Sequence, residues 1–277
     1  MRIKNIRAAC LLTDQILAEV VANLRFGKSE IAVAREIRKL TRLNKARIAF
    51  PPIVAFGRNS ATPHHKPSAR KLKRGDIIKI DLGTKVGGFC SDLTRTFFTA
   101  KPTDFQKKIY QAVLAAQKIG IAKTRAGVSG KSLDEFARNF LARKGFAKNF
   151  IHSLGHGLGR KIHQNPKVGP KSKSSLRIGD TITIEPGLYF RGKFGIRIED
   201  TLVVEKNCAE VLTKYPKKLR VLKIRIESDI HECRLLKCRG EKTAKNRGDS
   251  VPRLELRARN RAGGRAQRNV GRAFSVE

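Results

Sequence analysis

Acidic residues that close strand-like apolar segments are the feature of this sequence that most constrains its fold. Asp81 ends the segment IIKID, Glu185 ends TITIE, Glu199 ends GIRIE, and Asp92 stands in FCSD eleven residues after Asp81. An ionised carboxyl group at the end of a buried strand is costly unless it is paired or bound to a metal. A single acid of this kind could belong to a surface salt bridge, but four are difficult to explain in that way. We therefore expect the four carboxylates to converge on one site.

A histidine between glycines offers a fifth ligand to this site. His156 lies in the string GHGLG, where a flexible backbone can bring an imidazole close to the carboxylates. A hard, anionic, oxygen-rich ligand set suits a pair of divalent ions, and a metal pair in a closed site usually performs hydrolysis. The predicted metal ligands are Asp81, Asp92, His156, Glu185 and Glu199.

The order of periodic segments predicts an α+β domain made of two similar halves. Helices are expected over 7–25, from Glu30 after the cap Ser29, over 105–124 after Thr103 or Asp104, and over 133–143 after Ser132. Strands are expected over 48–56, within KRGDIIKIDLG and its hairpin partner GGFCSDLTRTFF, over 181–190 and over 195–205, with a further strand or helix at 218–226. The resulting order, αα-ββ-αα-ββ, is typical of a domain with a mostly antiparallel sheet.

A net charge of +37 over 277 residues raises the question of a nucleic-acid or ribosome partner. The chain has no Trp and three Tyr, and no basic run alternates with aromatic residues. The basic excess is spread along the chain rather than confined to its C-terminal part. We therefore favour a general basic bias, and a nucleic-acid partner is the less favoured alternative.

Residues 228–277 differ in texture from the rest of the chain. They are rich in Arg, Gly and Asn, and their hydrophobic periodicity is poor. This change predicts a folded domain over 1–227 followed by a basic, disordered tail.

The sequence favours a cytoplasmic protein without a membrane partner. It has no apolar run of about 18 residues, and Asp14 and Glu19 interrupt the N-terminal apolar segment, which indicates an amphipathic helix rather than a signal peptide. The five cysteines form no CxxC motif, so free thiols in a reducing compartment are the simplest interpretation.

The strings that carry the candidate ligands resemble those of a known enzyme family. IKIDLG, FCSDLTRT, HSLGHGLG, ITIEPGLY and GIRIEDT are similar to the catalytic domain of the pita-bread metallopeptidases, which include methionine aminopeptidase, aminopeptidase P and prolidase. The resemblance covers about residues 5–225. It implies the pita-bread fold, in which pseudo-twofold αα-ββ halves form a curved antiparallel sheet.

The resemblance also implies how the ligands are shared between two ions. Asp92 and Glu199 would bridge both metals, Asp81 would complete one ion, and His156 with Glu185 would complete the other. A hydroxide bridging the metals would attack the scissile carbonyl, with Glu185 as general base. Oxygen-rich ligation favours manganese, with cobalt, iron and zinc as alternatives.

Three further histidines match positions that line the family's substrate site. By resemblance, His64 and His163 bind or protonate the substrate around the scissile bond, and His152 lines the pocket for the residue that follows it. His65 is interpreted only as a neighbour of His64.

Two other side chains are expected near the site by the same resemblance. Arg197 would hold a ligating carboxylate or screen the anionic cluster. Tyr189 would face the substrate, although a packed strand aromatic is an equally simple interpretation of that residue.

The neighbouring strings favour the proline-specific branch of the family. NSATPHH, CSDLTRT and GIRIEDT resemble aminopeptidase P and prolidase, which predicts hydrolysis of an N-terminal Xaa-Pro bond in peptides with a free N-terminus and proline second. Prolidase-type dipeptide cleavage and methionine aminopeptidase activity are the alternatives. We expect the family's N-terminal domain to be absent, which leaves substrate length and a homo-oligomeric state open.

A protein of another class is the competing hypothesis. Some pita-bread proteins bind ribosomes, histones or other partners without catalysis, and the high positive charge would suit such a role. The complete set of candidate ligands argues for an enzyme, because a buried anionic cluster is costly to keep without a use.

Overall fold

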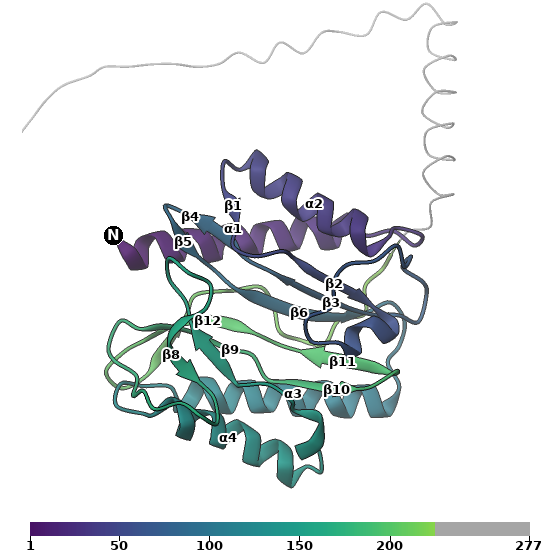
Figure 1. Cartoon of the computed structure of the whole chain (residues 1–277). Helices are drawn as coiled ribbons and strands as arrows, with labels where there is room; N and C mark the ends of the chain where they lie inside the picture. The colour runs from purple at the N-terminus through teal and green to yellow at the C-terminus, as the bar shows by residue number, and fades with distance from the viewer. Residues whose placement is uncertain (225–277) are drawn as a thin grey trace, which may run out of the picture. The chain divides into compact units, whose positions relative to one another are not determined.

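The computed structural model describes residues 1–224, which form two halves of similar build (Figure 1). The first half comprises α1 (Arg2–Ala22), α2 (Glu30–Leu43), β1 (Arg47–Ile48), β2 (Ile53–Phe56), the 3-10 helix η1 (Gly57–Ala61), β3 (Ile77–Leu82), β4 (Thr84–Val86), β5 (Phe89–Cys90) and β6 (Leu93–Phe98). The second half comprises α3 (Asp104–Lys123), α4 (Gly130–Arg143), the 3-10 helix η2 (Ala147–Asn149), β7 (Gly155–Gly157), β8 (Gln164–Val168), β9 (Thr181–Ile184), β10 (Gly187–Phe190), β11 (Phe194–Arg197), β12 (Asp200–Val204) and β13 (Ala209–Val211).

Polar caps explain where three of the helices begin. As predicted, Ser29 caps α2, and its hydroxyl accepts a hydrogen bond from Ala32 N at 3.2 Å. Thr103, one of the two predicted caps of α3, forms a capping box with Gln106. The predicted start of α4 at Ser132 is wrong by three residues, because Ser129 is the cap. A Cβ on Gly130 would lie 2.1 Å from Lys167 O, so this first turn lies against a neighbouring backbone that only glycine can approach.

The strand pairings between named strands are antiparallel, in agreement with the predicted sheet. The sheets have the orders β2-β3-β6, β13-β12-β9-β7-β8, β10-β11 and β1-β4-β5. Three expected strands are each divided in two, at Pro51–Pro52, at Glu185–Pro186 and at Ile198–Glu199. Over 218–224 the chain forms only an isolated bridge between Val221 and Phe98.

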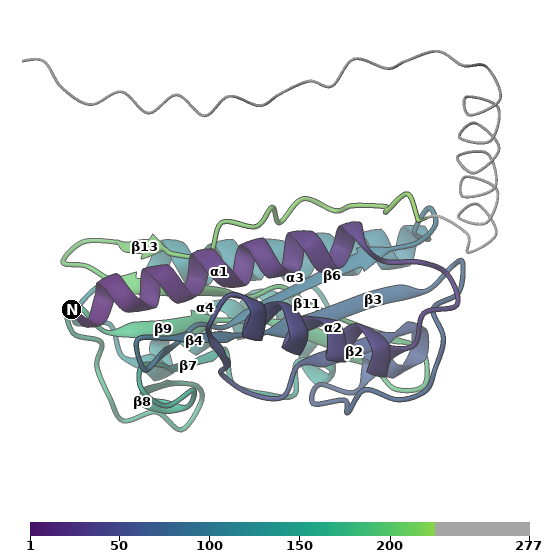
Figure 2. The ribbon, with the colours of Figure 1, turned by 90° about the horizontal axis from the view of Figure 1, so that it is seen from above.

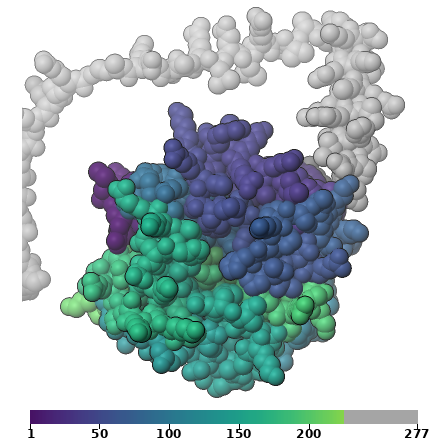
Figure 3. Space-filling view, viewed as in Figure 1, coloured from purple at the N-terminus to yellow at the C-terminus, as the bar shows by residue number. Residues whose placement is uncertain are grey.

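The helices lie outside and the strands lie between them (Figures 1 and 2). One apolar core joins α1 and α2 to β2, β3 and β6, and another joins α3 and α4 to β9–β12. Surface atoms of the first half, purple to blue, meet those of the second half, teal to green, across the face shown in Figure 3. Each half therefore has a core of its own between its helices and its strands, and a third apolar cluster contains residues of both halves.

Hydrogen bonds between the halves fix the strands that carry the acids. The Thr96 hydroxyl donates to Arg197 O at 2.9 Å, and Glu199 N donates to Thr94 O at 3.1 Å. The Thr201 hydroxyl donates to Asp92 O at 2.8 Å. These bonds align the end of β11 and the start of β12 with β6, and so bring the two acidic hairpins together.

The expected domain boundary at residue 227 and the expected tail over 228–277 lie outside the described residues. Among the helices described within residues 1–224, none is long and apolar enough to cross a lipid bilayer.

Candidate metal centre

The five predicted metal ligands line one cavity of about 920 Å³. Asp81 lies on β3, Asp92 lies just before β6, and His156 lies in the middle of β7. Glu185 follows β9, and Glu199 joins β11 to β12. Each carboxylate thus stands at or next to a strand end, where the two halves meet.

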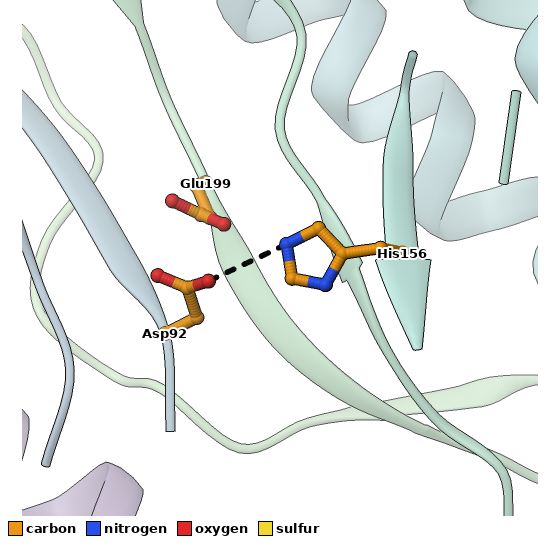
Figure 4. Close-up of side chains that lie close together, drawn as sticks. All are labelled: Asp92, His156 and Glu199. Carbon is orange, nitrogen blue, oxygen red and sulfur yellow. Dashed lines mark ion pairs between the residues drawn. The ribbon is translucent and has the colours of Figure 1, made fainter. Parts of the chain in front are cut away.

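Asp92, His156 and Glu199 form the centre of this group (Figure 4). One ligand atom from each lies within 4.8 Å of the others, a spacing that could hold a metal ion. His156 Nε2 is 3.5 Å from Asp92 Oδ2 and 3.3 Å from Glu185 Oε1. Four of the predicted ligands are therefore linked by short distances.

The backbone around His156 directs its imidazole into the cavity. The ring Nδ1–H donates to Gly157 O at 3.1 Å, which leaves Nε2 free to bind a metal. His156 N donates to the Thr183 hydroxyl at 3.1 Å. A Cβ on Gly155 would lie 2.0 Å from Thr183 O, so the glycine before His156 permits the close approach of β7 to β9.

Asp81 is attached to the group through Arg197. The Arg197 guanidinium forms an ion pair with Asp81 Oδ2, and both side chains are buried. Within the described part of the chain, Asp81 Oδ1 and Asp92 Oδ1 are buried without a hydrogen-bond partner. Buried, unpartnered carboxylate oxygens in one cavity are what a divalent cation would satisfy, so these residues fit metal ions.

The electrostatics of the cluster lead to the same conclusion. Burial and then the charges of Asp81 and Glu185 raise the pKa of Asp92 well above its usual value. Burial and then Asp92, Glu185 and Asp81 raise the pKa of Glu199 in the same way. The pKa of Glu185 is also raised, first by burial, although His156 and Arg197 oppose the shift. The charge of Arg197 therefore does not offset the negative charges of the cluster, and bound cations would do so.

Two threonines that support the ligands were not predicted from the sequence. The Thr94 hydroxyl donates to Glu199 Oε2, and the Thr183 hydroxyl donates to Glu185 Oε1 at 3.1 Å. Thr183 lies two residues before Glu185, on the same side of its strand. The spacing of two residues could have identified Thr183 from the sequence. Thr94 could not have been identified in this way, because it and Glu199 come from different halves of the molecule.

The predicted substrate histidines lie in the lining of the same cavity. The rings of His156 and His163 are 4.3 Å apart between centroids, in a T-shaped arrangement. Burial lowers the pKa of His163, with a further contribution from His156, and burial lowers the pKa of His64, with a further contribution from Arg197. Burial lowers the pKa of His152 to about 3, so this ring is neutral at neutral pH.

Tyr189 lies behind the cavity wall rather than among its lining residues. Its hydroxyl accepts a hydrogen bond from Arg197 Nη1 at 2.9 Å and lies 3.0 Å from His152 Nε2. In this structure Tyr189 therefore connects Arg197 to His152, and the predicted contact with substrate remains a prediction.

A buried charge network supports the strand behind Glu199. Arg95 Nη2 is 2.7 Å from Asp200 Oδ1, and the Arg95 guanidinium also donates to the carbonyl of Glu199. Asp200 Oδ2 accepts from Gln117 Nε2 at 2.7 Å and from Lys217 Nζ at 2.5 Å. The residue next to a candidate ligand is thus tied to both halves of the molecule.

Comparison with known proteins agrees with the fold. Residues 4–206 match Metallopeptidase family M24. The Xaa-Pro dipeptidase of Pyrococcus horikoshii is 40% identical over 218 residues, which cover 78% of this chain and 62% of that protein.

Solved structures give the same picture. Prolidase from Pyrococcus furiosus superposes with a TM-score of 0.75 at 39% identity, covering 77% of this chain and 64% of the other. X-Pro aminopeptidase from Thermotoga maritima superposes with a TM-score of 0.77 at 37% identity, covering 81% of this chain and 63% of the other. The expected pita-bread architecture is confirmed by these likenesses. This chain spans less than two thirds of the length of the first curated relatives that it matches, 62% and 63%. From the match over residues 4–206, the chain belongs to Metallopeptidase family M24.

Proposed function

We propose that this chain is a metal-dependent peptidase that releases the N-terminal residue in front of proline. The observation that carries the proposal is the cluster of the buried Asp92 and Glu199 with the half-buried His156, whose ligand atoms lie within 4.8 Å of one another. The names of its relatives, Xaa-Pro dipeptidase and X-Pro aminopeptidase, support proline as the second residue of the substrate.

The residues suited to hold two divalent ions are the five predicted ligands, Asp81, Asp92, His156, Glu185 and Glu199, all of which line the cavity. When bound, such ions lower the pKa of a coordinated water and polarise the carbonyl that is attacked. Manganese is our proposed metal, because carboxylates dominate the ligand set. Glu185 is the proposed general base, since its Oε1 is oriented by the Thr183 hydroxyl and faces the cavity.

The side chains around the cluster have proposed roles in binding the peptide. His64 and His163 are exposed imidazoles in the cavity lining, and their ring nitrogens can donate to or accept from the groups at the scissile bond. His152 is proposed to contact the residue after this bond. Arg197 orients Asp81, because its guanidinium pairs with that carboxylate and is itself held by Tyr189.

A panel of Xaa-Pro-Yaa tripeptides, Xaa-Pro dipeptides and the peptide Met-Ala-Ser tests the proposal. We expect the folded, manganese-loaded protein to cleave Xaa-Pro-Yaa tripeptides and to leave Met-Ala-Ser intact. Preferred release of Met would replace the assignment with methionine aminopeptidase. If the loaded protein binds metal and cleaves none of the peptides, the enzyme assignment is wrong and the non-catalytic alternative takes its place.

Dipeptide cleavage is a second candidate function. It is favoured by the Xaa-Pro dipeptidase name of the relative that is 40% identical. Comparison of Xaa-Pro with Xaa-Pro-Yaa in the same assay separates the two activities, and hydrolysis of the dipeptide alone would assign prolidase-type activity. A cytoplasmic location and a homo-oligomeric state remain predictions.

His163→Ala is expected to keep the metal and lose catalytic rate. The imidazole lies beside His156 but outside the predicted ligand set, so the variant should bind metal at the wild-type level. Loss of a group that moves or stabilises a proton near the scissile bond should lower kcat by about 10²-fold.

The measurement for His163 is metal content by mass spectrometry together with kcat on a tripeptide. His156→Ala is the matched control and should lose metal as well as activity. Full rate in His163→Ala would contradict the role that we assign to this residue.

A further inference from the structure

The segment 57–68 carries His64 to the cavity lining, yet the His64 side chain has no hydrogen-bond partner among residues 1–224. Its placement therefore depends on the backbone on either side of it. Pro63 precedes His64 and His65 follows it, and each of these neighbours is bound by a buried charged residue.

Glu30, at the start of α2, binds the segment at both ends. Its Oε1 accepts from Phe56 N at 2.7 Å and from Asn59 Nδ2 at 2.9 Å. Its Oε2 accepts from His65 Nε2 at 2.8 Å, from Ser68 N at 2.9 Å and from the Ser68 hydroxyl at 2.6 Å. This carboxylate is fully buried, and its hydrogen bonds lower its pKa although burial alone would raise it.

Lys79 binds the middle of the segment from the opposite side. Its Nζ donates to the carbonyl oxygens of Ser60, Thr62 and Pro63 at 3.0, 2.7 and 3.3 Å. The three donors of the lysine are thus matched by three backbone acceptors, and the side chain is fully buried. Arg197 Nη1 also donates to Pro63 O at 3.2 Å.

The position of Lys79 on β3 connects this segment to the candidate metal centre. Lys79 and Asp81 are two residues apart on one strand, so their side chains leave the same face of the sheet. The strand that supplies a candidate ligand therefore also supplies the lysine that holds the carbonyl before His64.

We propose that Glu30 and Lys79 are positioning residues, which hold Pro63 and His65 and thereby fix His64 relative to the metal ligands. The effect on catalysis rests on the proposed peptidase function, whereas the effect on the segment does not. Neither Glu30 nor Lys79 is among the residues that line the cavity, so we expect them to act through His64 rather than on substrate.

The test compares Lys79→Met and Glu30→Gln with a matched control, Glu36→Gln. Glu36 lies on the same helix and binds Lys28 and Asn23, which are outside the segment. Amide hydrogen exchange over residues 57–68 should become about tenfold faster or more in both variants and stay at the wild-type rate in the control. Metal content should not change in any of the three proteins.

Peptidase kinetics provide the second measurement. A displaced His64 should lower kcat/KM by about 10–10²-fold, since misplacement by about 1 Å has effects of this size. In a His64→Ala background, Lys79→Met should then cause almost no additional loss, because the residue through which it acts is already absent.

Two results would overturn the proposal. One is unchanged exchange over residues 57–68 in folded Lys79→Met and Glu30→Gln, and the other is an equal loss of kcat/KM with and without His64. If Lys79→Met does not fold, Glu30→Gln supplies both measurements. If the wild-type protein cleaves no Xaa-Pro peptide, the proposed function fails while hydrogen exchange still decides whether the two residues hold the segment.

Discussion

Asp92→Asn is expected to abolish metal binding and to lower kcat/KM by at least about 10³-fold. Asp92 belongs to the group whose ligand atoms lie within 4.8 Å of one another, and its Oδ1 is buried without a partner in residues 1–224. Removal of a residue that merely supports a metal ligand costs about 10–10²-fold in affinity or activity, so loss of a ligand should cost more. Metal content and tripeptide hydrolysis measure the two effects.

In the metal-free protein, Asp92→Asn should increase stability. The pKa of Asp92 is raised in the folded state, so its contribution to stability is present below the unfolded pKa of about 3.9 and is lost as pH rises through the folded pKa. At pH 7.5 the metal-free wild type therefore bears the cost of a crowded anionic cluster. Asp92→Asn removes one charge, so its melting temperature in EDTA should exceed that of the wild type.

The difference in melting temperature between Asp92→Asn and the wild type should depend on pH and on metal. It should shrink when the measurement is repeated at pH 5, because protons then relieve the repulsion in the wild type. Added manganese should reverse it, because only the wild type gains stability by binding the ion. Glu135→Gln, an exposed partner of Lys131, is the control and should show none of these changes. A metal-free Asp92→Asn protein that melts below the wild type at pH 7.5 would refute this account of the cluster.

Much of the fold could be predicted because local signals and the tertiary structure agree. Ser29 and Thr103 precede apolar helical periods, and each caps a helix in the structure. The start of α4 was predicted three residues too late, because Ser129 and Ser132 are equivalent as local signals. The choice between them depends on Gly130, whose close approach to Lys167 O is a tertiary contact.

The candidate site shows the same division between local and long-range information. An acid that closes an apolar strand is visible in the sequence, and all of the predicted ligands line one cavity. Glu30 and Lys79 were not predicted to matter for the site. Lys79 stands within the apolar segment IIKID, and only its position beneath the carbonyls of Ser60, Thr62 and Pro63 explains it. The sequence separation of these partners conceals the relation.

Asp200→Ala is expected to destabilise the protein by about 3–5 kcal/mol, because it leaves the Arg95 guanidinium buried without its carboxylate. Arg95 is 1% exposed and Asp200 is fully buried, so water cannot replace the lost partner. Burial opposes ionisation of Asp200, but the charges of Arg95 and Lys217 outweigh it and lower the pKa of this carboxyl group. Urea unfolding in EDTA at pH 7.5 measures the loss, with Glu210→Ala as a control in which an exposed pair with Arg7 should cost less than about 1 kcal/mol.

Asp200 and Asp92 should respond to pH with opposite signs. Because the folded pKa of Asp200 is lowered, its stabilisation is present above the unfolded pKa of about 3.9 and is lost as pH falls through the folded pKa. The difference in free energy of unfolding between wild type and Asp200→Ala should therefore be constant from about pH 5 upward and should narrow below about pH 4. Glu199, the residue before Asp200, has a raised pKa, first because it is buried and then because Asp92, Glu185 and Asp81 surround it. A gap that widens on acidification would show that Asp200 does not stabilise the fold as the ionised partner of Arg95.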